Sequence, residues 1–80
     1  MTTNFEGKKF TFVTDATIEY RSNIGNFTCM NPNDWMSAIV ADNTGKQFKA
    51  WFKIKNPDAE MDDFNFCDYN NITDIDNIDG

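Results

Sequence analysis

The stretch from Gly45 to Lys55, GKQFKAWFKIK, constrains the fold most, because apolar and polar side chains alternate along most of it. Successive side chains of an extended strand point to opposite faces of a sheet. One face would carry Phe48, Ala50, Phe52 and Ile54. The other would carry Gln47, Lys49, Trp51, Lys53 and Lys55, which mixes cations with one large aromatic ring. The pattern predicts a strand whose phenylalanine side is buried.

The segment 35–41, WMSAIVA, precedes this strand and fits two interpretations. An amphipathic helix would place Trp35, Met36, Ile39 and Val40 on one stripe, whereas a strand would be apolar on both faces. The following Asp42-Asn43-Thr44-Gly45 has glycine where a bulged hairpin requires it. This turn favours the strand.

The first part of the chain predicts shorter strands. Residues 1–7 are polar and resemble a short leader. Asp15 is a typical turn residue, and the small polar residues at 22–26 favour a chain reversal. Alternating or apolar runs separated by these turns predict strands at 8–14, 16–21 and 27–30.

The composition changes after Lys55. Asn56 followed by Pro57, with acidic residues next, is typical of a helix start. We expect a helix of about two or three turns there, with Met61 and Phe64 facing the sheet.

Further along, apolar residues recur at every third position, which suits a turn-rich or extended segment better than a helix of 3.6 residues per turn. These residues are Phe66, Tyr69, Ile72, Ile75 and Ile78.

Together these patterns predict one mainly β (α+β) domain over residues 1–80. We expect a small antiparallel meander or partly closed barrel of about five strands, with one short C-terminal helix and an acidic tail. The β core would span 1–55, and the acidic helix and tail would span 56–80.

Charge is distributed unevenly along the chain. Residues 1–55 contain all 7 cations, whereas residues 56–80 contain acids and no cation. The net charge of the whole chain is −6. The C-terminal quarter is therefore the natural candidate for contact with a basic partner.

Several kinds of chemistry find little support in the sequence. Histidine, the most versatile general base near neutral pH, is absent. Asp74 and Asp76 have the spacing of a calcium loop, but Ile78 stands where the next ligand is needed. The two cysteines, Cys29 and Cys67, are expected to be buried thiols. We therefore expect no enzyme, no metal site and no cofactor.

The expected location is cytoplasmic. The first residues contain no apolar run like a signal peptide, and no stretch approaches the roughly 20 apolar residues of a membrane helix.

The first functional hypothesis is a non-enzymatic inhibitor or adaptor that occupies a basic, nucleic-acid-binding surface of a protein partner. Carboxylates would replace phosphates, and aromatic rings would add apolar contacts. In smallness, acidity and lack of catalytic groups, the chain is similar in type to phage-encoded inhibitors of host nucleic-acid enzymes or defence complexes. The candidate partner-binding residues are Asp62, Asp63, Phe66, Asp68, Tyr69, Asp74 and Asp76.

The alternative is a single-stranded nucleic-acid-binding module, with the acidic tail as an autoinhibitory or docking arm. Bases stack on exposed aromatic rings while cations contact the phosphates. Its candidate residues are Lys49, Trp51, Lys53 and Lys55. An equally simple interpretation is that Trp51 packs under the C-terminal segment, with lysine side chains at its rim.

Overall fold

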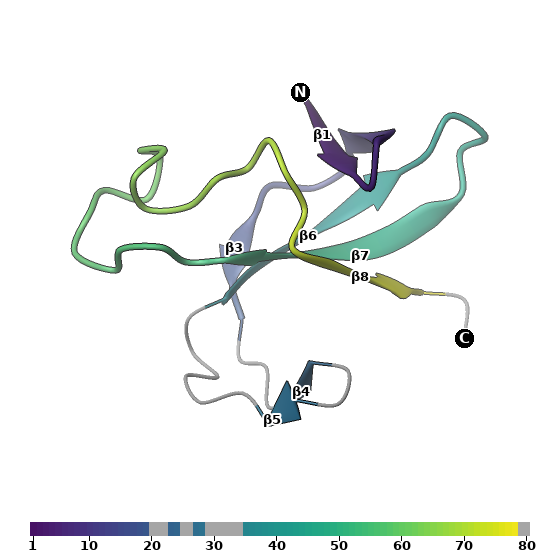
Figure 1. The fold of residues 1–80 in the computed structure, drawn as a ribbon. Helices are drawn as coiled ribbons and strands as arrows, with labels where there is room; N and C mark the ends of the chain where they lie inside the picture. Colours follow the sequence, from purple (N-terminus) through teal and green to yellow (C-terminus); the bar gives the residue numbers. More distant parts are fainter. Residues whose placement is uncertain (20–22, 25–26, 29–34, 79–80) are drawn as a thin grey trace.

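The computed structural model describes residues 1–19, 23–24, 27–28 and 35–78, and this part of the chain consists of strands, turns and loops (Figure 1). Six strands form one antiparallel sheet in the order β1-β2-β6-β7-β8, with β3 also paired to β6. A separate two-stranded sheet pairs β4 (Asn23–Ile24) with β5 (Phe27–Thr28). The strands of the larger sheet are Thr2–Phe5 (β1), Lys8–Phe12 (β2), Thr17–Ile18 (β3), Trp35–Ala41 (β6), Gln47–Lys53 (β7) and Asp74–Asn77 (β8). The predicted mainly β fold is confirmed, and the sheet is open rather than closed into a barrel.

The β6–β7 hairpin is the centre of the sheet. Its pairs run from Trp35 opposite Lys53 to Ala41 opposite Gln47. At the turn, the Asp42 carboxylate accepts hydrogen bonds from the Thr44 amide at 2.9 Å and the Lys46 amide at 3.1 Å. Gly45 adopts a φ of +88°, which residues with a Cβ rarely do. The predicted strand at 35–41 and the predicted turn are confirmed.

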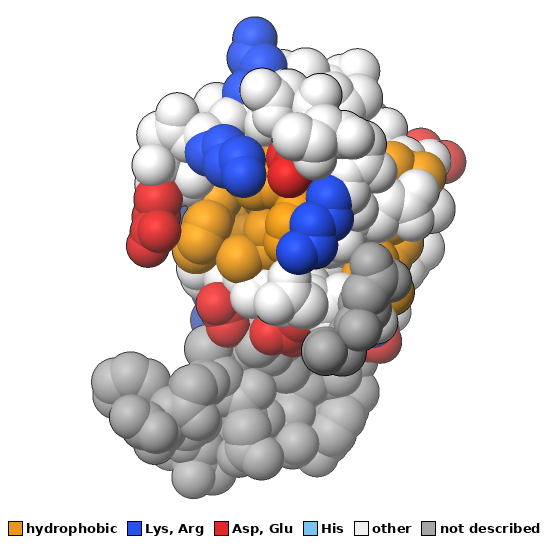
Figure 2. Space-filling view, turned by 90° about the vertical axis from the view of Figure 1, so that its right-hand side faces the viewer, with side chains coloured by type: hydrophobic (Ala, Val, Ile, Leu, Met, Phe, Trp, Pro, Cys, Tyr) orange, Lys and Arg blue, Asp and Glu red, His pale blue; other side chains and the backbone are white. Residues whose placement is uncertain are grey.

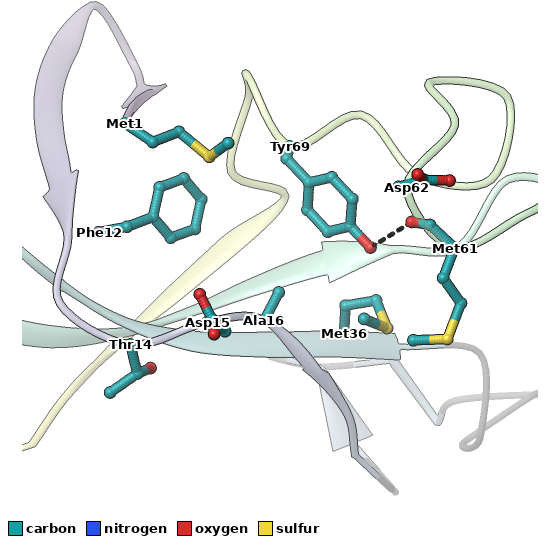
Figure 3. Close-up of a pocket in the computed structure, with 9 residues that line it drawn as sticks. All are labelled: Met1, Phe12, Thr14, Asp15, Ala16, Met36, Met61, Asp62 and Tyr69. Atoms are coloured by element: carbon teal, nitrogen blue, oxygen red, sulfur yellow. Dashed lines mark hydrogen bonds between the residues drawn. The ribbon is translucent and has the colours of Figure 1, made fainter.

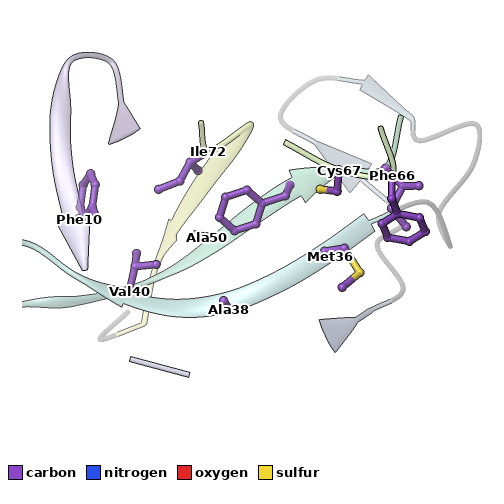
Figure 4. Close-up of a cluster of buried hydrophobic side chains, with 10 residues drawn as sticks. Phe10, Met36, Ala38, Val40, Ala50, Phe66, Cys67 and Ile72 are labelled. Atoms are coloured by element: carbon purple, nitrogen blue, oxygen red, sulfur yellow. The ribbon is translucent and has the colours of Figure 1, made fainter. Parts of the chain in front are cut away.

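The hydrophobic core lies against one face of β6 and β7 (Figure 4). Phe52 and Val40 are fully buried at its centre, and Phe10 contributes from β2. The C-terminal segment adds Phe66 and Ile72. Burying one such side chain stabilises the fold by about 1.5–3 kcal/mol. Of the predicted core face of β7, Ala50, Phe52 and Ile54 are buried and Phe48 is half-buried.

The end of the molecule seen in Figure 2 shows hydrophobic side chains between lysine side chains. Lys8 Nζ lies 5.6 Å from the ring centroid of Phe10, and Lys46 Nζ lies 5.2 Å from that of Phe48. An ammonium group within about 6 Å of a ring centroid makes a cation–π contact. Lys8 Nζ also lies 3.6 Å from a carboxylate oxygen of Asp42.

The β2 and β3 strands lie along the same edge of β6. Thr11 and Phe12 pair with one end of β6, and Thr17 and Ile18 pair with the other. Between them, the Val13 amide donates to the Ile39 carbonyl at 2.8 Å. Asp15, predicted as a turn residue between two strands, lies where the backbone continues along the same edge of β6, so β2 and β3 share one partner. Residues 20 and 21 of the strand predicted at 16–21, and residues 29–30 of the one at 27–30, lie outside the described residues.

The N-terminal residues form a strand, so the prediction of a leader at 1–7 is wrong. β1 pairs with β2 through a two-residue turn at Glu6 and Gly7, whose φ values are 52° and 80°. Two successive positive φ values match the twist of a tight hairpin. Asn4 also forms an isolated bridge with Asn71, which joins β1 to the chain ahead of β8.

The predicted C-terminal helix is not found, because residues 56–66, all of them described, form successive turns. The Asn56 side chain accepts a hydrogen bond from the Asp58 amide at 3.1 Å, and the Asp63 side chain accepts one from the Asn65 amide at 2.9 Å. Such side-chain bonds compete with helical backbone bonds. Met61 and Phe64 were predicted to face the sheet, but they are 50% and 58% exposed.

The apolar residues at every third position lie in turns and in an extended strand, as predicted. Phe66 and Ile72 are buried, and Tyr69 and Ile75 pack against the core. Ile78 is 45% exposed. The extended part is β8, a strand that the sequence pattern does not predict; it pairs with β7 along Phe48 to Trp51.

Candidate functional site

The clearest candidate for function is an acidic loop, residues 56–66, whose two ends lie side by side. The Lys55 amide donates to the Phe66 carbonyl at 2.7 Å, and Ile54 forms a bridge with Cys67. A compact surface segment closed at its base in this way is an Ω-loop, a type that often carries function.

Backbone contacts inside the acidic loop fix its shape. The Asp63 amide donates to the Glu60 carbonyl at 2.9 Å, and the Phe66 amide donates to the Asp63 carbonyl at 2.9 Å. Outside the loop, the Tyr69 hydroxyl donates to the Met61 carbonyl at 3.1 Å and so connects the loop to the body of the domain. These contacts hold the loop without a helix.

The acidic loop presents carboxylates beside apolar groups. Its exposed acids are Asp58, Glu60, Asp62 and Asp63. Met61 and Phe64 are exposed between or next to them, and no Lys or Arg occurs from 56 to 66. Lys55, at the base of the loop, places its Nζ 3.6 Å from the centroid of the Phe64 ring. The exposed side of the loop is thus negatively charged and partly apolar.

A groove of about 410 Å³ separates the acidic loop from the β2–β3 connection (Figure 3). Met61, Asp62 and Tyr69 form one wall, and the fully buried Met36 belongs to β6. The remaining lining residues are Met1, Phe12, Thr14, Asp15 and Ala16. Apolar side chains therefore predominate, with Asp15 and Asp62 as the two acids, both exposed.

Tyr69 connects the groove to the core. Its ring lies 5.7 Å from that of Phe52, in an edge-to-face arrangement. Burial raises the pKa of Tyr69 above its ordinary value of 10.0, and the neighbouring Cys67 and Asp62 act in the same direction. The hydroxyl therefore stays neutral and remains a donor to Met61.

The structure divides the predicted partner-binding residues into separate groups. Asp62 and Asp63 lie on the acidic loop, and Asp62 lines the groove together with Tyr69. Phe66 is only 4% exposed and belongs to the core. Asp68 is half-buried in the next turn, where its carboxylate accepts bonds from the Asn70 amide and the Asn71 side chain, both at 3.0 Å.

The other two predicted residues, Asp74 and Asp76, lie on β8 and face away from the core. They pair in register with Trp51 and Lys49, which occupy the sheet face opposite Ala50. Carboxylates on the acidic loop and on β8 are therefore presented by different elements.

The face predicted for nucleic acid is occupied by internal contacts. Trp51 is only 6% exposed and meets Trp35 edge-to-face at 6.5 Å. Lys49 Nζ lies 2.6 Å from a Glu19 carboxylate oxygen and 4.8 Å from the Trp51 ring centroid. Lys53 Nζ lies 5.3 Å from the Trp35 ring centroid. In this arrangement Trp51 offers no open ring face for a base, as the packing interpretation of Trp51 predicts.

Glu19 is held by two donors on this face. Hydrogen bonds from Lys49 and from the Ser37 hydroxyl hold the pKa of Glu19 below its ordinary value of 4.5. Ser37 itself is buried. The arrangement stabilises the charged form of the carboxylate and is suited to structure rather than to acid–base chemistry.

Most of the groove has no signal in the sequence. Met1 falls in the predicted leader, and Ala16 falls in a predicted strand without a functional role. These residues meet Tyr69 and Met61 only in the folded chain. No local pattern connects them.

The comparisons with known proteins identify no relative. No family model matches the sequence, and no curated protein and no solved structure matches the chain. The part of the chain that the structure describes contains no helix long and apolar enough to cross a membrane.

Proposed function

We propose that this chain is a non-enzymatic binding domain, an inhibitor or adaptor, that uses its acidic loop to occupy a basic, nucleic-acid-binding surface of a protein partner. The observation that carries the proposal is the closed loop 56–66, which holds exposed carboxylates and no cation. The absence of histidine from the sequence supports binding rather than catalysis.

Two properties of the acidic loop support this role. Its carboxylates are solvent-exposed, so they are free to approach the cations of a partner without breaking a core contact. Met61 and Phe64 are exposed beside them and would be removed from water on contact. Charge then steers and orients the partner, while apolar burial supplies affinity.

The test compares two variants that raise the net charge by the same amount. The loop variant is Glu60→Gln/Asp62→Asn/Asp63→Asn, in which the amide side chain introduced at position 63 keeps an oxygen for the Asn65 amide. The matched control is Glu6→Lys/Gln47→Lys, which changes the charge by the same amount at two exposed positions outside the acidic loop. The probe is a synthetic peptide rich in lysine and arginine, bound to a fluorescent single-stranded oligonucleotide.

The parent protein and the control variant should displace the oligonucleotide from the peptide, as measured by fluorescence anisotropy. The loop variant should bind the peptide with at least about tenfold lower affinity than the parent protein. Raised salt should weaken the binding of the parent protein to the peptide. Equal loss in both variants would show that total charge, not the acidic loop, governs binding. No displacement by the parent at low salt would overturn the proposal.

A further inference from the structure

The groove beside the acidic loop combines an apolar interior with an acidic border. Phe12 and Tyr69 line it, and each ring packs against Phe52, at centroid distances of 5.8 Å and 5.7 Å. The hollow is thus continuous with the core, and the exposed side chains of Met1 and Met61 form its outer part. An apolar group placed there would extend the core packing.

The volume of the groove suits a side-chain-sized occupant. At about 410 Å³ it falls near the lower end of the roughly 300–1,000 Å³ typical of small-ligand sites. Its methionines, Met1, Met36 and Met61, have flexible and polarisable side chains that adapt to different apolar shapes. These features indicate that the groove selects its occupant more by polarity than by shape.

Charge decides between possible occupants. Among the described residues that line the groove, Asp15 and Asp62 have the only charged side chains, and none is a lysine or arginine. Further acids, Asp58 and Glu60, stand exposed on the same loop as Asp62. A second copy of this chain, with a net charge of −6, would be repelled by such a border, whereas a segment rich in lysine or arginine would be attracted.

We infer that the groove receives an apolar side chain from a basic segment of the partner, with lysine or arginine neighbours of that side chain pairing with Asp15 and Asp62. The inference rests on the proposed function and supplies its apolar anchor. Binding would bury the anchor against Phe12, Met61 and Tyr69, and it would place the flanking cations over the two carboxylates.

Three synthetic peptides test the inference on the full chain. The first carries leucine flanked by arginines, the second replaces leucine with alanine, and the third replaces the arginines with glutamates. Isothermal titration gives the affinities, and NMR of ¹³C-methyl methionine reports contact at Met1, Met36 and Met61. The leucine–arginine peptide should bind at least about tenfold more tightly than either other peptide and should shift these methyl signals.

Protein variants locate the contact. Ala16→Phe fills the groove, and the matched control Val13→Phe adds the same ring at an exposed position that does not line it. Met61→Ala removes an exposed wall and serves as a second groove variant whose folding does not depend on burial. Both groove variants should bind the leucine–arginine peptide several-fold more weakly than the parent protein, and Val13→Phe should bind it as the parent does. Circular dichroism checks that each variant is folded.

The outcomes separate this inference from the proposed function. Equal affinity for the leucine and alanine peptides, with no effect of Ala16→Phe or Met61→Ala, would overturn the inference that the groove receives an apolar side chain. The proposed function would still hold in that case, because basic peptides still bind the acidic loop. Equal affinity for the arginine- and glutamate-flanked peptides would overturn the inference that the occupant comes from a basic segment. Failure of both arginine peptides to bind overturns the groove inference and the proposed function together.

Discussion

The indole Nε1 of Trp51 donates a hydrogen bond to Oδ2 of Asp76, 2.8 Å away, and so connects β7 to β8 on the sheet face opposite the core. Trp51 is buried, so an indole donor without an acceptor would be costly there. The same contact explains why this aromatic ring is part of the domain's own packing.

Asp76→Ala should lower the free energy of unfolding by about 1–3 kcal/mol, because it removes the acceptor of a buried donor. Asp76→Asn should cost less, since its amide oxygen can still accept. Urea denaturation followed by tryptophan fluorescence measures both. Asp62→Asn, at an exposed position, controls for the loss of one negative charge. Equal losses for Asp76→Ala and Asp76→Asn would contradict the role of the hydrogen bond.

The contribution of Glu19 to the free energy of unfolding should depend on pH. Its pKa is lowered in the folded chain by hydrogen bonds from Lys49 and Ser37, so the folded state favours the charged form. The contribution is therefore present above the ordinary value of 4.5 and is lost as the pH falls through the folded pKa.

Glu19→Gln should consequently be less stable than the parent near neutral pH by about 0.2–1 kcal/mol, the range of partly exposed ion pairs. The difference should vanish in acid. Urea denaturation at a series of pH values tests this, with Glu60→Gln on the acidic loop as the control. A difference that persists unchanged at low pH would rule out the ionic contact as its cause.

Substitutions at Asp63 can separate the contribution of turn formation from that of charge on the acidic loop. Asp63→Ala removes the acceptor of the Asn65 amide and should lower the free energy of unfolding by about 0.5–1.5 kcal/mol. Asp63→Asn removes the same charge but keeps a turn-forming oxygen, and it should be nearly as stable as the parent. Urea denaturation compares the two; identical stabilities would show that the side-chain bond does not stabilise the loop.

The thiol of Cys67 should be protected from thiol reagents. It is free and buried, and burial raises its pKa to about 11 from an ordinary value of 9.0, with Asp68 acting in the same direction. In a Cys29→Ser background, a disulfide reagent should react with folded Cys67 about 100-fold more slowly than with the unfolded chain near neutral pH. Absorbance of the released thiol gives both rates. Equal rates would exclude burial at this position. Cys29 lies outside the described residues.

The central hairpin could be predicted because its signals are local. Alternation along 45–55 sets the faces of β7, and the turn at Asp42 to Gly45 sets the direction of β6. Segment 35–41 alone left helix and strand both open. Pairing with β7 decided it, since both faces of β6 carry apolar side chains and both are largely buried.

The prediction for 56–66 failed because helix-start signals and turn signals use the same residues. Asn and Asp cap helices, but they also bind their own backbone two residues further on. In this chain Asn56 and Asp63 do the latter. The ends of the loop are then joined by Lys55 and Phe66, a contact that spacing along the sequence does not indicate.

By itself, the sequence determined the strand at the centre of the sheet, the face it buries and the concentration of acids after residue 55, because alternation and charge are properties of neighbouring residues. Only the tertiary structure decided that Trp51 and Phe66 are buried while Met61 and Phe64 are exposed. It also brought Ala16, Met36 and Tyr69 to one groove. Burial depends on which distant segment covers a side chain, and here that segment is fixed by the pairing of β8 with β7 and by the closure of the acidic loop.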